Sequence, residues 1–404
     1  MKLVFANNYF YLRGGSERVF FSEMELLSSR GHEIVPFCRQ SGADGLSGGE
    51  GYFYFPADLR YEGVPLKARL FAAPRLVYSL DAKKKFLELL RDKRPNLIHA
   101  HNIYGRLTTS ILDAARKKNT PVVMTLHDSK LICPSYLMLS GGRVCEACEG
   151  RKFHNCLVKK CHAKGFLPSV LYTLESYFNY FLGKYDWVRY FICPSRFIMA
   201  KHSEYGIPRE KLVHIPNFIR ISEYRPQFAP GNYILYMGRL SKEKGVMTLL
   251  KTARRMDVPF VIAGDGPSRA EYEDFIGKNN MKHVRLAGYK TGGQLKSLIR
   301  DAAFVVFPSE CYENAPMAIL ETMACGKPVI GSDIGGVPEM VIENETGLLF
   351  KPGHYYHLEE KIEYLLARPS KISEMGRNAR KLVEENYSEE GHYEKLLALY
   401  RAAS

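Results

Sequence analysis

The stretch "AFVVFPSECYENAPMAILETMACGKPVIGSD", residues 303–333, reads as a strand, a helix and a second strand. "AFVVFPS" and "PVIGSD" are short apolar runs of the kind that form parallel strands buried on both faces. Between them, "MAILETMACG" has the composition of a helix. Two parallel strands joined by a helix form the repeating unit of doubly wound α/β sheets. This stretch therefore predicts the α/β fold class.

The same alternation of apolar runs and helical patterns extends along all 404 residues, which are too many for a single core. We therefore predict two doubly wound domains and a terminal helix from "SEEGHYEKLLALYRAA". The segment "ISEYRPQFAPG", residues 221–231, reads as an inter-domain linker. Further strands are expected at "KLVFAN", "HEIVPFC", "NLIHAH", "PVVMTLH", "YFICPS" and "KLVHIPN", and later at "YILYMGRL", "FVIAGDG", "VRLAGY" and "GLLF".

The composition, 46% hydrophobic and 25% charged, is typical of a soluble globular protein. No apolar run approaches the roughly 18 to 20 residues that cross a bilayer, and the N-terminal sequence becomes polar too early for a signal peptide. We expect a cytoplasmic protein.

The net charge of +14 is concentrated in the first half of the chain. Residues 1–200 contain 29 Lys and Arg against 17 Asp and Glu, a net charge of +12. This asymmetry suggests an anionic partner, which could be a membrane surface, a lipid-phosphate substrate or nucleic acid. A solvated basic surface without a partner explains it equally well.

Glycines and cations follow several predicted strands, where ligands bind in open α/β sheets. Gly14 and Gly15 open a helix and could let a phosphate approach its free N–H groups. Arg239 and Lys244 in "MGRLSKEKG" could hold a diphosphate, and Gly264 lies in the turn "AGDGP". Taken singly, these features also fit ordinary turns and a solvated basic loop.

Two glutamates border the helix in the opening stretch. We expect Asn314 to cap this helix, with Pro316 in its first turn and Glu313 beside the free N–H groups. A carboxylate for sugar hydroxyls next to amides for phosphate suits a nucleotide-sugar site. Glu321, about two turns further along, would accept from ribose hydroxyls. Two carboxylates on a partly exposed helix are the alternative.

Together, Arg239, Lys244, the Glu313-x7-Glu321 pair, "GKPVIGSDIGGVPE" and "ENETGLLF" resemble retaining glycosyltransferases of the GT-B type, family 4-like, from residue 1 to the final helix. The resemblance implies two Rossmann-like domains that face a cleft. It implies an acceptor-binding domain at 1–218, a nucleotide-sugar domain at 219–386 and a C-terminal helix at 387–404 that returns to the first domain.

The resemblance also implies roles for donor-site residues, with a UDP- or GDP-linked sugar as substrate. Arg239 and Lys244 would bind the diphosphate and act in catalysis with Glu313, which would hold hydroxyls of the transferred sugar. The family usually has glycine where this chain has Pro316. The other implied donor-binding residues are Gly14, Gly15, Gly264, Tyr289, Lys290, Asn314, Ala315, Pro316 and Glu321.

His127 and Asp128 in "TLHDSK" resemble the family's acceptor-side motif. A neutral His127 could hydrogen-bond the donor sugar near its anomeric carbon. His101, and less strongly His99, could line the acceptor site, although single histidines more often serve a core or surface role. No nucleophile for double displacement is evident, which favours front-face substitution without a catalytic metal or other cofactor.

An insertion at 131–165 carries a cysteine cluster. Cys145, Cys148, Cys156 and Cys161 have the spacing C-x2-C-x7-C-x4-C, with Cys133 as a substitute ligand. Because disulfides are disfavoured in the cytoplasm, the spacing suggests structural zinc, with an iron–sulfur cluster or free thiols as alternatives.

The basic insertion would face an anionic membrane or a polyprenyl-diphosphate-linked glycan. The preferred function is retaining glycosyl transfer to a glycan or lipid-linked acceptor in bacterial capsule, exopolysaccharide or lipopolysaccharide assembly, at the inner face of the plasma membrane and without nucleic acid. The alternatives are a basic zinc-knuckle protein that binds nucleic acid and a GT-B-type sugar-nucleotide epimerase, or a catalytically silent relative that only binds nucleotide. The zinc-knuckle alternative leaves residues 308–339 unexplained.

Overall fold

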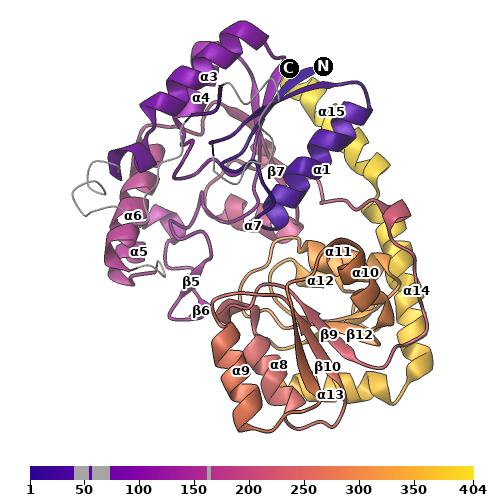
Figure 1. Ribbon diagram of the computed structural model, residues 1–404. Helices are drawn as coiled ribbons and strands as arrows, with labels where there is room; N and C mark the ends of the chain where they lie inside the picture. The colour runs from indigo at the N-terminus through magenta and orange to yellow at the C-terminus, as the bar shows by residue number, and fades with distance from the viewer. Residues whose placement is uncertain (41–53, 57–72, 162–164) are drawn as a thin grey trace. The chain divides into compact units, whose positions relative to one another are not determined.

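The chain folds into two compact units in the computed structural model, which describes residues 1–40, 54–56, 73–161 and 165–404 (Figure 1). The main division, after Ile215, lies three residues before the expected one. The segment 221–231 belongs to the second unit and is not a boundary, contrary to the expected linker. The first unit comprises Met1–Gly141, Cys145–Ile215 and Tyr393–Ser404, and the second comprises Gly142–Val144 and Pro216–His392.

The first unit contains a six-stranded sheet in the order β2-β1-β3-β4-β7-β8, and all the pairings are parallel. The apolar runs of the first half predicted every one of these strands. Their bounds are β1 Lys2–Ala6, β2 Glu33–Phe37, β3 Leu97–Ala100, β4 Val122–Thr125, β7 Val188–Cys193 and β8 Leu212–His214.

Helices cover both faces of this sheet, which makes it doubly wound. Helices α1 (Gly15–Ser29) and α15 (Glu389–Ala403) pack on one face through residues such as Phe20 and Leu396. Helices α3 (Leu80–Lys93) and α4 (Ser110–Lys117) lie side by side on the other (Figure 1). The expected return of the terminal helix to this unit is observed from Tyr393 onward. The unit also contains α7 (Arg196–Glu204) and the 3₁₀ turn η3 (Arg209–Lys211).

The cysteine-rich insertion forms small elements that the apolar periodicity did not predict. Residues 162–164 of this insertion, including His162, lie outside the described part of the chain. The elements are the hairpin strands β5 (Leu139–Ser140) and β6 (Arg143–Val144), the 3₁₀ turn η2 (Glu149–Arg151) and helix α5 (His154–Val158), followed by α6 (Phe166–Phe181).

The second unit contains a six-stranded parallel sheet in the order β11-β10-β9-β12-β13-β14. The strand order reverses between β9 and β12, which makes their carboxyl ends the topological switch point where such sheets bind ligands. All six strands were predicted. Their bounds are β9 Ile234–Met237, β10 Phe260–Ala263, β11 Val284–Gly288, β12 Phe304–Phe307, β13 Val329–Ser332 and β14 Gly347–Phe350.

Helices also cover both faces of the second sheet. Helices α8 (Val246–Ala253), α9 (Arg269–Lys278) and α13 (Tyr355–Leu366) pack on one face. Helices α10 (Gly292–Asp301), α11 (Met317–Ala324) and α12 (Val337–Met340) pack on the other. The remaining elements are α14 (Pro369–Asn386) and the 3₁₀ turns η4 (Ile221–Glu223) and η5 (Lys242–Lys244).

The segment expected to be a linker is bonded to this second core. The amide of Gln227 donates to the carbonyl oxygen of Cys325 at 2.8 Å, and that of Gly231 donates to the carbonyl of Ala302 at 3.2 Å. Among the helices that the structure describes, none is long and apolar enough to cross a membrane.

Candidate functional site

Lys244 and Glu313 form an ion pair at the switch point of the second sheet. Lys244 follows β9 and Glu313 follows β12, and the Nζ–Oε1 distance is 2.6 Å. The hydroxyl of Ser309 donates to the same carboxylate oxygen at 2.6 Å. Two loops that are far apart in the sequence therefore place a cation and a carboxylate together at the carboxyl ends of adjacent strands.

The carboxylate of this pair keeps Lys244 protonated. Burial alone would lower the pKa of Lys244, but the Glu313 carboxylate raises the pKa above its ordinary value. Burial raises the pKa of the neighbouring Cys311 thiol to about 11, and the Glu313 charge adds to this effect. At neutral pH the loop after β9 therefore presents an ammonium group, and the loop after β12 presents a neutral thiol.

The glycine turn after β13 supports the backbone of Glu313. The amide of Gly336 donates to the Glu313 carbonyl oxygen at 2.7 Å. Gly335 has a φ of +60°, and a Cβ atom there would lie 2.5 Å from that same oxygen. Only glycine combines this backbone conformation with such a close approach. The two glycines thus hold the glutamate loop in position.

Arg239 and Gly264 lie in neighbouring loops of the same unit. Gly264 has a φ of +155°, and a Cβ there would lie 1.8 Å from the carbonyl oxygen of Gly238, so the loops after β9 and β10 touch backbone to backbone. Arg239 is exposed. Its carbonyl oxygen accepts from the Tyr236 hydroxyl at 2.9 Å, which ties the backbone of this loop to β9.

The predicted helix cap is wrong by two residues. Helix α11 begins at Met317, and its N-cap position is Pro316, whose ψ of 118° is extended and whose side chain provides no cap. Asn314 was expected in that place. The side-chain amide of Asn217 donates to the carbonyl oxygen of Ala315 at 3.0 Å, which fixes the chain just before the helix.

The second glutamate of the pair is buried. Glu321 lies in the middle of α11, and its Oε1 accepts from the Tyr224 hydroxyl at 3.2 Å. Tyr224 comes from the segment that the sequence had suggested as a linker, so its part in the site was not predicted.

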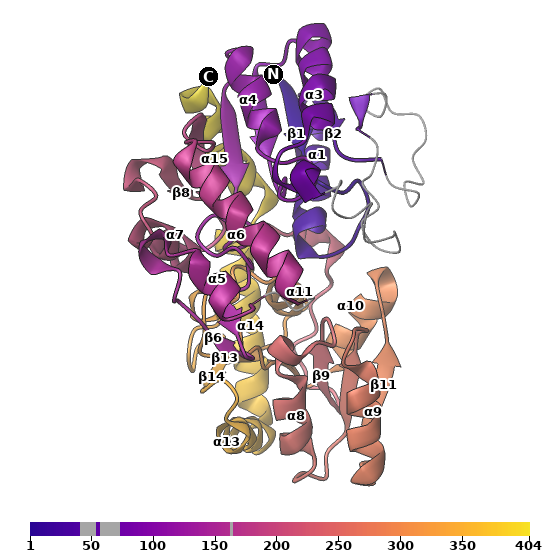
Figure 2. The ribbon, with the colours of Figure 1, turned by 90° about the vertical axis from the view of Figure 1, so that its left-hand side faces the viewer.

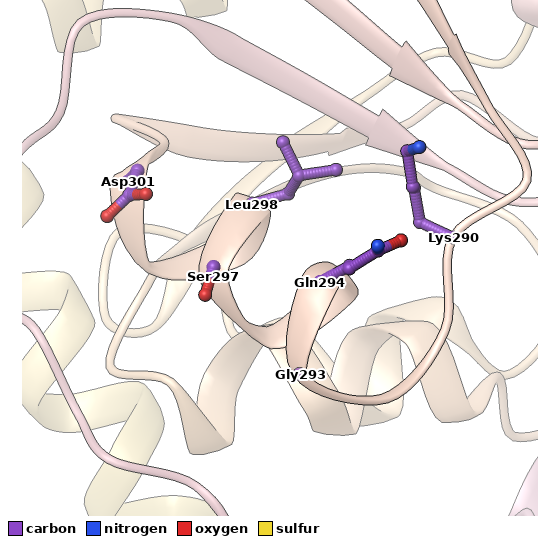
Figure 3. Close-up of a pocket in the computed structure, with 6 residues that line it drawn as sticks. All are labelled: Lys290, Gly293, Gln294, Ser297, Leu298 and Asp301. Carbon is purple, nitrogen blue, oxygen red and sulfur yellow. The ribbon is translucent and has the colours of Figure 1, made fainter.

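Tyr289 and Lys290, predicted near the base, follow β11. Tyr289 is largely exposed, and Lys290 borders a shallow hollow beside α10 (Figure 3). Figure 3 shows the hollow's other lining residues, Gly293, Gln294, Ser297, Leu298 and Asp301.

In the first unit, three histidines and a glutamate form a polar network that includes His127. The His127 Nε2 lies 2.8 Å from Nδ1 of His101. The His101 Nε2 lies 3.5 Å from Oε2 of Glu23, and Nδ1 of His99 lies 3.6 Å from the same oxygen. His101 was predicted to line the acceptor site, but it is completely buried, so it supports His127 instead of facing a ligand directly.

The nearest charge to the rings of this network is the Glu23 carboxylate, 3.5 Å from His101 Nε2. Because a carboxylate attracts a proton, we infer that His101 carries its proton on Nε2 and accepts at Nδ1 from His127 Nε2–H. Burial lowers the pKa of His127 to about 4, so its ring is neutral at neutral pH. The Nδ1 atom of His127 then remains a hydrogen-bond acceptor.

Asp128, the neighbour of His127, accepts from the backbone amide of Lys130 at 2.9 Å. Burial raises the pKa of Asp128 to about 6. Gly14 and Gly15 are exposed where α1 begins, and Gly14 is extended.

Glu23 was not predicted from the sequence, although a signal exists. It lies among Val19, Phe20, Leu26 and Leu27 on the core-facing side of α1, where an acidic residue is unexpected. Within the described residues, Glu23, His99 and His101 form the group of potential metal ligands whose atoms lie within 4.8 Å of one another. Both ring nitrogens of His99 already bond to other side chains, so the group is better described as a hydrogen-bond network.

The cysteines of the insertion gather around a small apolar cluster with Phe153 and Tyr177. Burial and the neighbouring thiols raise the pKa of Cys148, and burial with Cys161 and Cys133 raises the pKa of Cys156 to about 12. Among described residues, no three of these sulfur atoms lie within 4.8 Å of one another. The residue types suit a thiolate-preferring metal, but the sulfur atoms, as the structure describes them, do not form a closed ligand set.

Solved structures of high similarity show the same two-domain fold, the GT-B fold. Sucrose-phosphate synthase from Thermosynechococcus elongatus has a TM-score of 0.73 at 19% identity, and both chains are covered completely. Anabaena HepE in complex with UDP and glucose has a TM-score of 0.70 at 16% identity, again with complete coverage. These likenesses show the fold alone.

The profile of glycosyltransferase family 4 matches residues 13–223, and that of glycosyl transferases group 1 matches residues 221–382. The chain belongs to glycosyltransferase family 4.

Three curated relatives share part of the sequence. A glycosyltransferase of Methanocaldococcus jannaschii is 27% identical over 303 residues, 75% of this chain and 74% of the relative. Alpha-D-kanosaminyltransferase of Streptomyces kanamyceticus is 33% identical over 174 residues, 42% of this chain and 45% of the relative. D-rhamnosyltransferase WbpZ of Pseudomonas aeruginosa is 30% identical over 216 residues, 53% and 55% respectively. The chain thus spans about half the length of the latter two.

Proposed function

We propose that the chain transfers a sugar, with retention of configuration, from a nucleotide diphosphate sugar to a glycan or lipid-linked acceptor in bacterial polysaccharide assembly. The observation that carries this proposal is the Lys244–Glu313 pair at the switch point of the second sheet. Anabaena HepE binds UDP and UDP-glucose, which supports a nucleotide-sugar donor. A GDP-linked sugar is the other donor to test. The relative WbpZ is a D-rhamnosyltransferase, which supports a glycan product.

In this proposal Glu313 accepts from hydroxyls of the transferred sugar. Lys244 uses one of its three N–H donors on Glu313 and keeps the others for the diphosphate, together with the exposed Arg239. The remaining donor contacts are assigned to Glu321 for the ribose, to Tyr289 and Lys290 for the base, and to the backbone of Gly14, Gly15, Gly264, Asn314, Ala315 and Pro316 for phosphate and sugar.

Transfer would proceed by substitution on one face of the sugar. The acceptor hydroxyl attacks the anomeric carbon as the bond from that carbon to the phosphate oxygen breaks, and the hydroxyl proton moves to the departing oxygen. Lys244 and Arg239 stabilise the charge on the leaving diphosphate. The neutral His127 accepts from a sugar hydroxyl at Nδ1, and Asp128 lies on the acceptor side. No step requires a metal.

The test is transfer, or donor hydrolysis, measured with a panel of UDP- and GDP-sugars. We expect Glu313→Gln and Lys244→Met each to lower kcat/KM by about 100-fold or more while thermal unfolding stays near wild type. The exposed Glu345→Gln is the matched control and should retain activity. Full turnover by both site variants would refute the assignment. Binding of RNA with no affinity for any nucleotide sugar would favour the zinc-knuckle alternative.

We also propose that the insertion holds a structural zinc ion through Cys145, Cys148, Cys156 and Cys161, with Cys133 as the substitute. A metal would displace the thiol protons on binding, and its binding free energy would help a short polar segment to fold. Elemental analysis of protein purified without chelator should find about one zinc per chain. The Cys145→Ser/Cys148→Ser variant should lose it, whereas Cys193→Ala, a buried cysteine outside the cluster, should keep it. Iron and sulfide in place of zinc, or no metal, would overturn this assignment.

A further inference from the structure

Helix α6 is inverted relative to an ordinary surface helix. Its fully buried side chains are polar, whereas its most exposed side chains are apolar or aromatic. A helix that packs on a protein core normally shows the opposite arrangement. The buried residues of α6 are Ser169, Thr173, Glu175, Ser176 and Asn179.

Specific bonds hold this polar side inward. Lys130 Nζ lies 2.8 Å from Oε2 of Glu175, and both side chains are almost completely buried. The hydroxyl of Thr109 donates to Oδ1 of Asn179 at 2.7 Å. Rotating α6 to bury its apolar side would break the Lys130–Glu175 ion pair and the Thr109–Asn179 hydrogen bond and leave their buried groups unpaired, which is strongly destabilising. The orientation of the helix is therefore fixed by its polar contacts.

The outward side of α6 is a continuous apolar strip. Leu167, Leu174 and Phe181 recur every seven residues and so lie on one side of the helix. Their exposed fractions are 40%, 55% and 74%. We call this strip, extended at its ends by Phe166 and Leu182, the α6 apolar face. Figures 1 and 2 both place α6 on the outside of the first unit.

Basic residues lie near helix α6. The guanidinium of Arg151 lies 4.2 Å from the ring centre of Tyr180, the residue before Phe181. Helix α5 packs against α6 and ends at Val158, which is 72% exposed and is followed by the exposed Lys159 and Lys160. Neither lysine has an acidic ion-pair partner in the described ranges of the chain. The first 200 residues carry a net charge of +12. The chemistry around the apolar face is thus that of a surface that meets anions.

We propose that the α6 apolar face docks on an anionic lipid bilayer. The helix would lie in the plane of the headgroups, with Leu167, Leu174 and Phe181 in the acyl boundary. Lys159 and Lys160 would approach the lipid phosphates, where each cation strengthens binding to an anionic surface. The buried Glu175 stays on the protein side, so the polar contacts of α6 need not change. This inference does not depend on the sugar-transfer reaction.

The test is co-sedimentation of the full chain with vesicles. We expect binding to phosphatidylglycerol/phosphatidylcholine vesicles, weaker binding to pure phosphatidylcholine, and weakening of the anionic binding in high salt. Leu174→Glu/Phe181→Glu should reduce binding about tenfold or more, because it replaces two apolar contacts with two charges. Lys159→Glu/Lys160→Glu should reduce binding to anionic vesicles selectively.

The matched control is Leu80→Glu, which places the same charge at a leucine that is 72% exposed on α3. It should bind vesicles like wild type, and unfolding curves should be the same for all variants because the altered residues are exposed. Equal vesicle binding by wild type and Leu174→Glu/Phe181→Glu would overturn the proposal. A dimer that dissociates on the same double substitution, without any vesicle binding, would assign the face to a second copy of the chain and also overturn it.

Discussion

Single buried polar residues determine how the predicted site residues are presented. Glu23 lies 3.5 Å from His101, which contacts His127 in turn, and we infer that its charge sets the proton positions of both rings. Ser309 orients the Glu313 carboxylate by donating a hydrogen bond to the same oxygen that pairs with Lys244. The sequence pointed to the candidate residues of each group but not to the residues beneath them, because a supporting contact depends on tertiary packing and leaves no spacing pattern.

The Glu23 network leads to a prediction about His127. In wild type, ¹⁵N spectra of histidine-labelled protein should show His127 protonated at Nε2 and bare at Nδ1. Glu23→Gln should disturb this tautomer and lower kcat more than it raises KM, because the ring is misoriented while the donor site is intact. Tyr400→Phe, which removes a bond to His99 only, should leave the His127 tautomer unchanged. A wild-type His127 protonated at Nδ1 would contradict the assignment.

Burial of neutral histidines predicts a pH dependence of stability. Burial lowers the pKa of His127 and His202 to about 4 in the folded chain, against 6.5 when unfolded. Their contribution is complete above pH 6.5 and is lost as the pH falls toward 4, by up to about 1.4 kcal/mol per pH unit for each histidine. Asp128, whose folded pKa is raised to about 6, acts in the opposite direction, since its contribution is lost as the pH rises through 6.

A substitution at His202 isolates the contribution of one buried histidine to the pH dependence of stability. His202→Gln removes one buried histidine, so the loss of unfolding free energy between pH 6.5 and 4.5 should be smaller than in wild type. Urea unfolding followed by fluorescence measures this directly, because the chain has one tryptophan, Trp187, which lies in the first unit. Identical pH dependence in the two proteins would show that His202 is not titrating as described.

At the scale of elements, the loops after the strands carry the geometry of the candidate site. Every strand of both sheets was predicted, because buried parallel strands leave strong apolar runs. The start of α11 was placed too early, since Asn314 and Pro316 are both good residues for a helix start and the bond from Asn217 to Ala315 selects the later position. The inverted helix α6 was also beyond prediction, because its pattern is amphipathic whichever side is buried.

The glycine turn after β13 gives a prediction for one such loop. Gly335→Ala adds a Cβ at a φ of +60° that would lie 2.5 Å from the Glu313 backbone, so the turn or the glutamate loop must shift. We expect a loss of about 1–3 kcal/mol in unfolding free energy and a large loss of donor binding, measured by denaturation and calorimetry.

Gly277→Ala is the matched control for this loop. Gly277 lies in α9, and a Cβ there meets nothing within 4 Å. Alanine should be neutral or stabilise by about 0.5–1 kcal/mol. If the two substitutions had the same effect on donor binding, the turn would not be holding Glu313.

At the scale of the whole molecule, the chain builds two cores and contributes to the first from both of its ends. Strand β1 lies inside the first sheet, and the terminal helix α15 covers one face of it. The return of the chain to the first unit followed from family resemblance and not from periodicity, because an amphipathic helix does not specify which core it covers.

Leu396 tests how firmly the terminal helix belongs to the first core. It is completely buried against residues of β1, β3 and α1, so Leu396→Ala removes buried methyl groups and leaves a cavity. We expect a loss of about 2–5 kcal/mol, seen as a lower urea midpoint in the fluorescence of Trp187. Leu80→Ala, at an exposed leucine of the same unit, should change that midpoint little. Nucleotide affinity should be preserved in both variants, since the Lys244–Glu313 pair belongs to the second core. An unchanged Trp187 midpoint in Leu396→Ala would mean that the terminal helix adds no stability to the first unit.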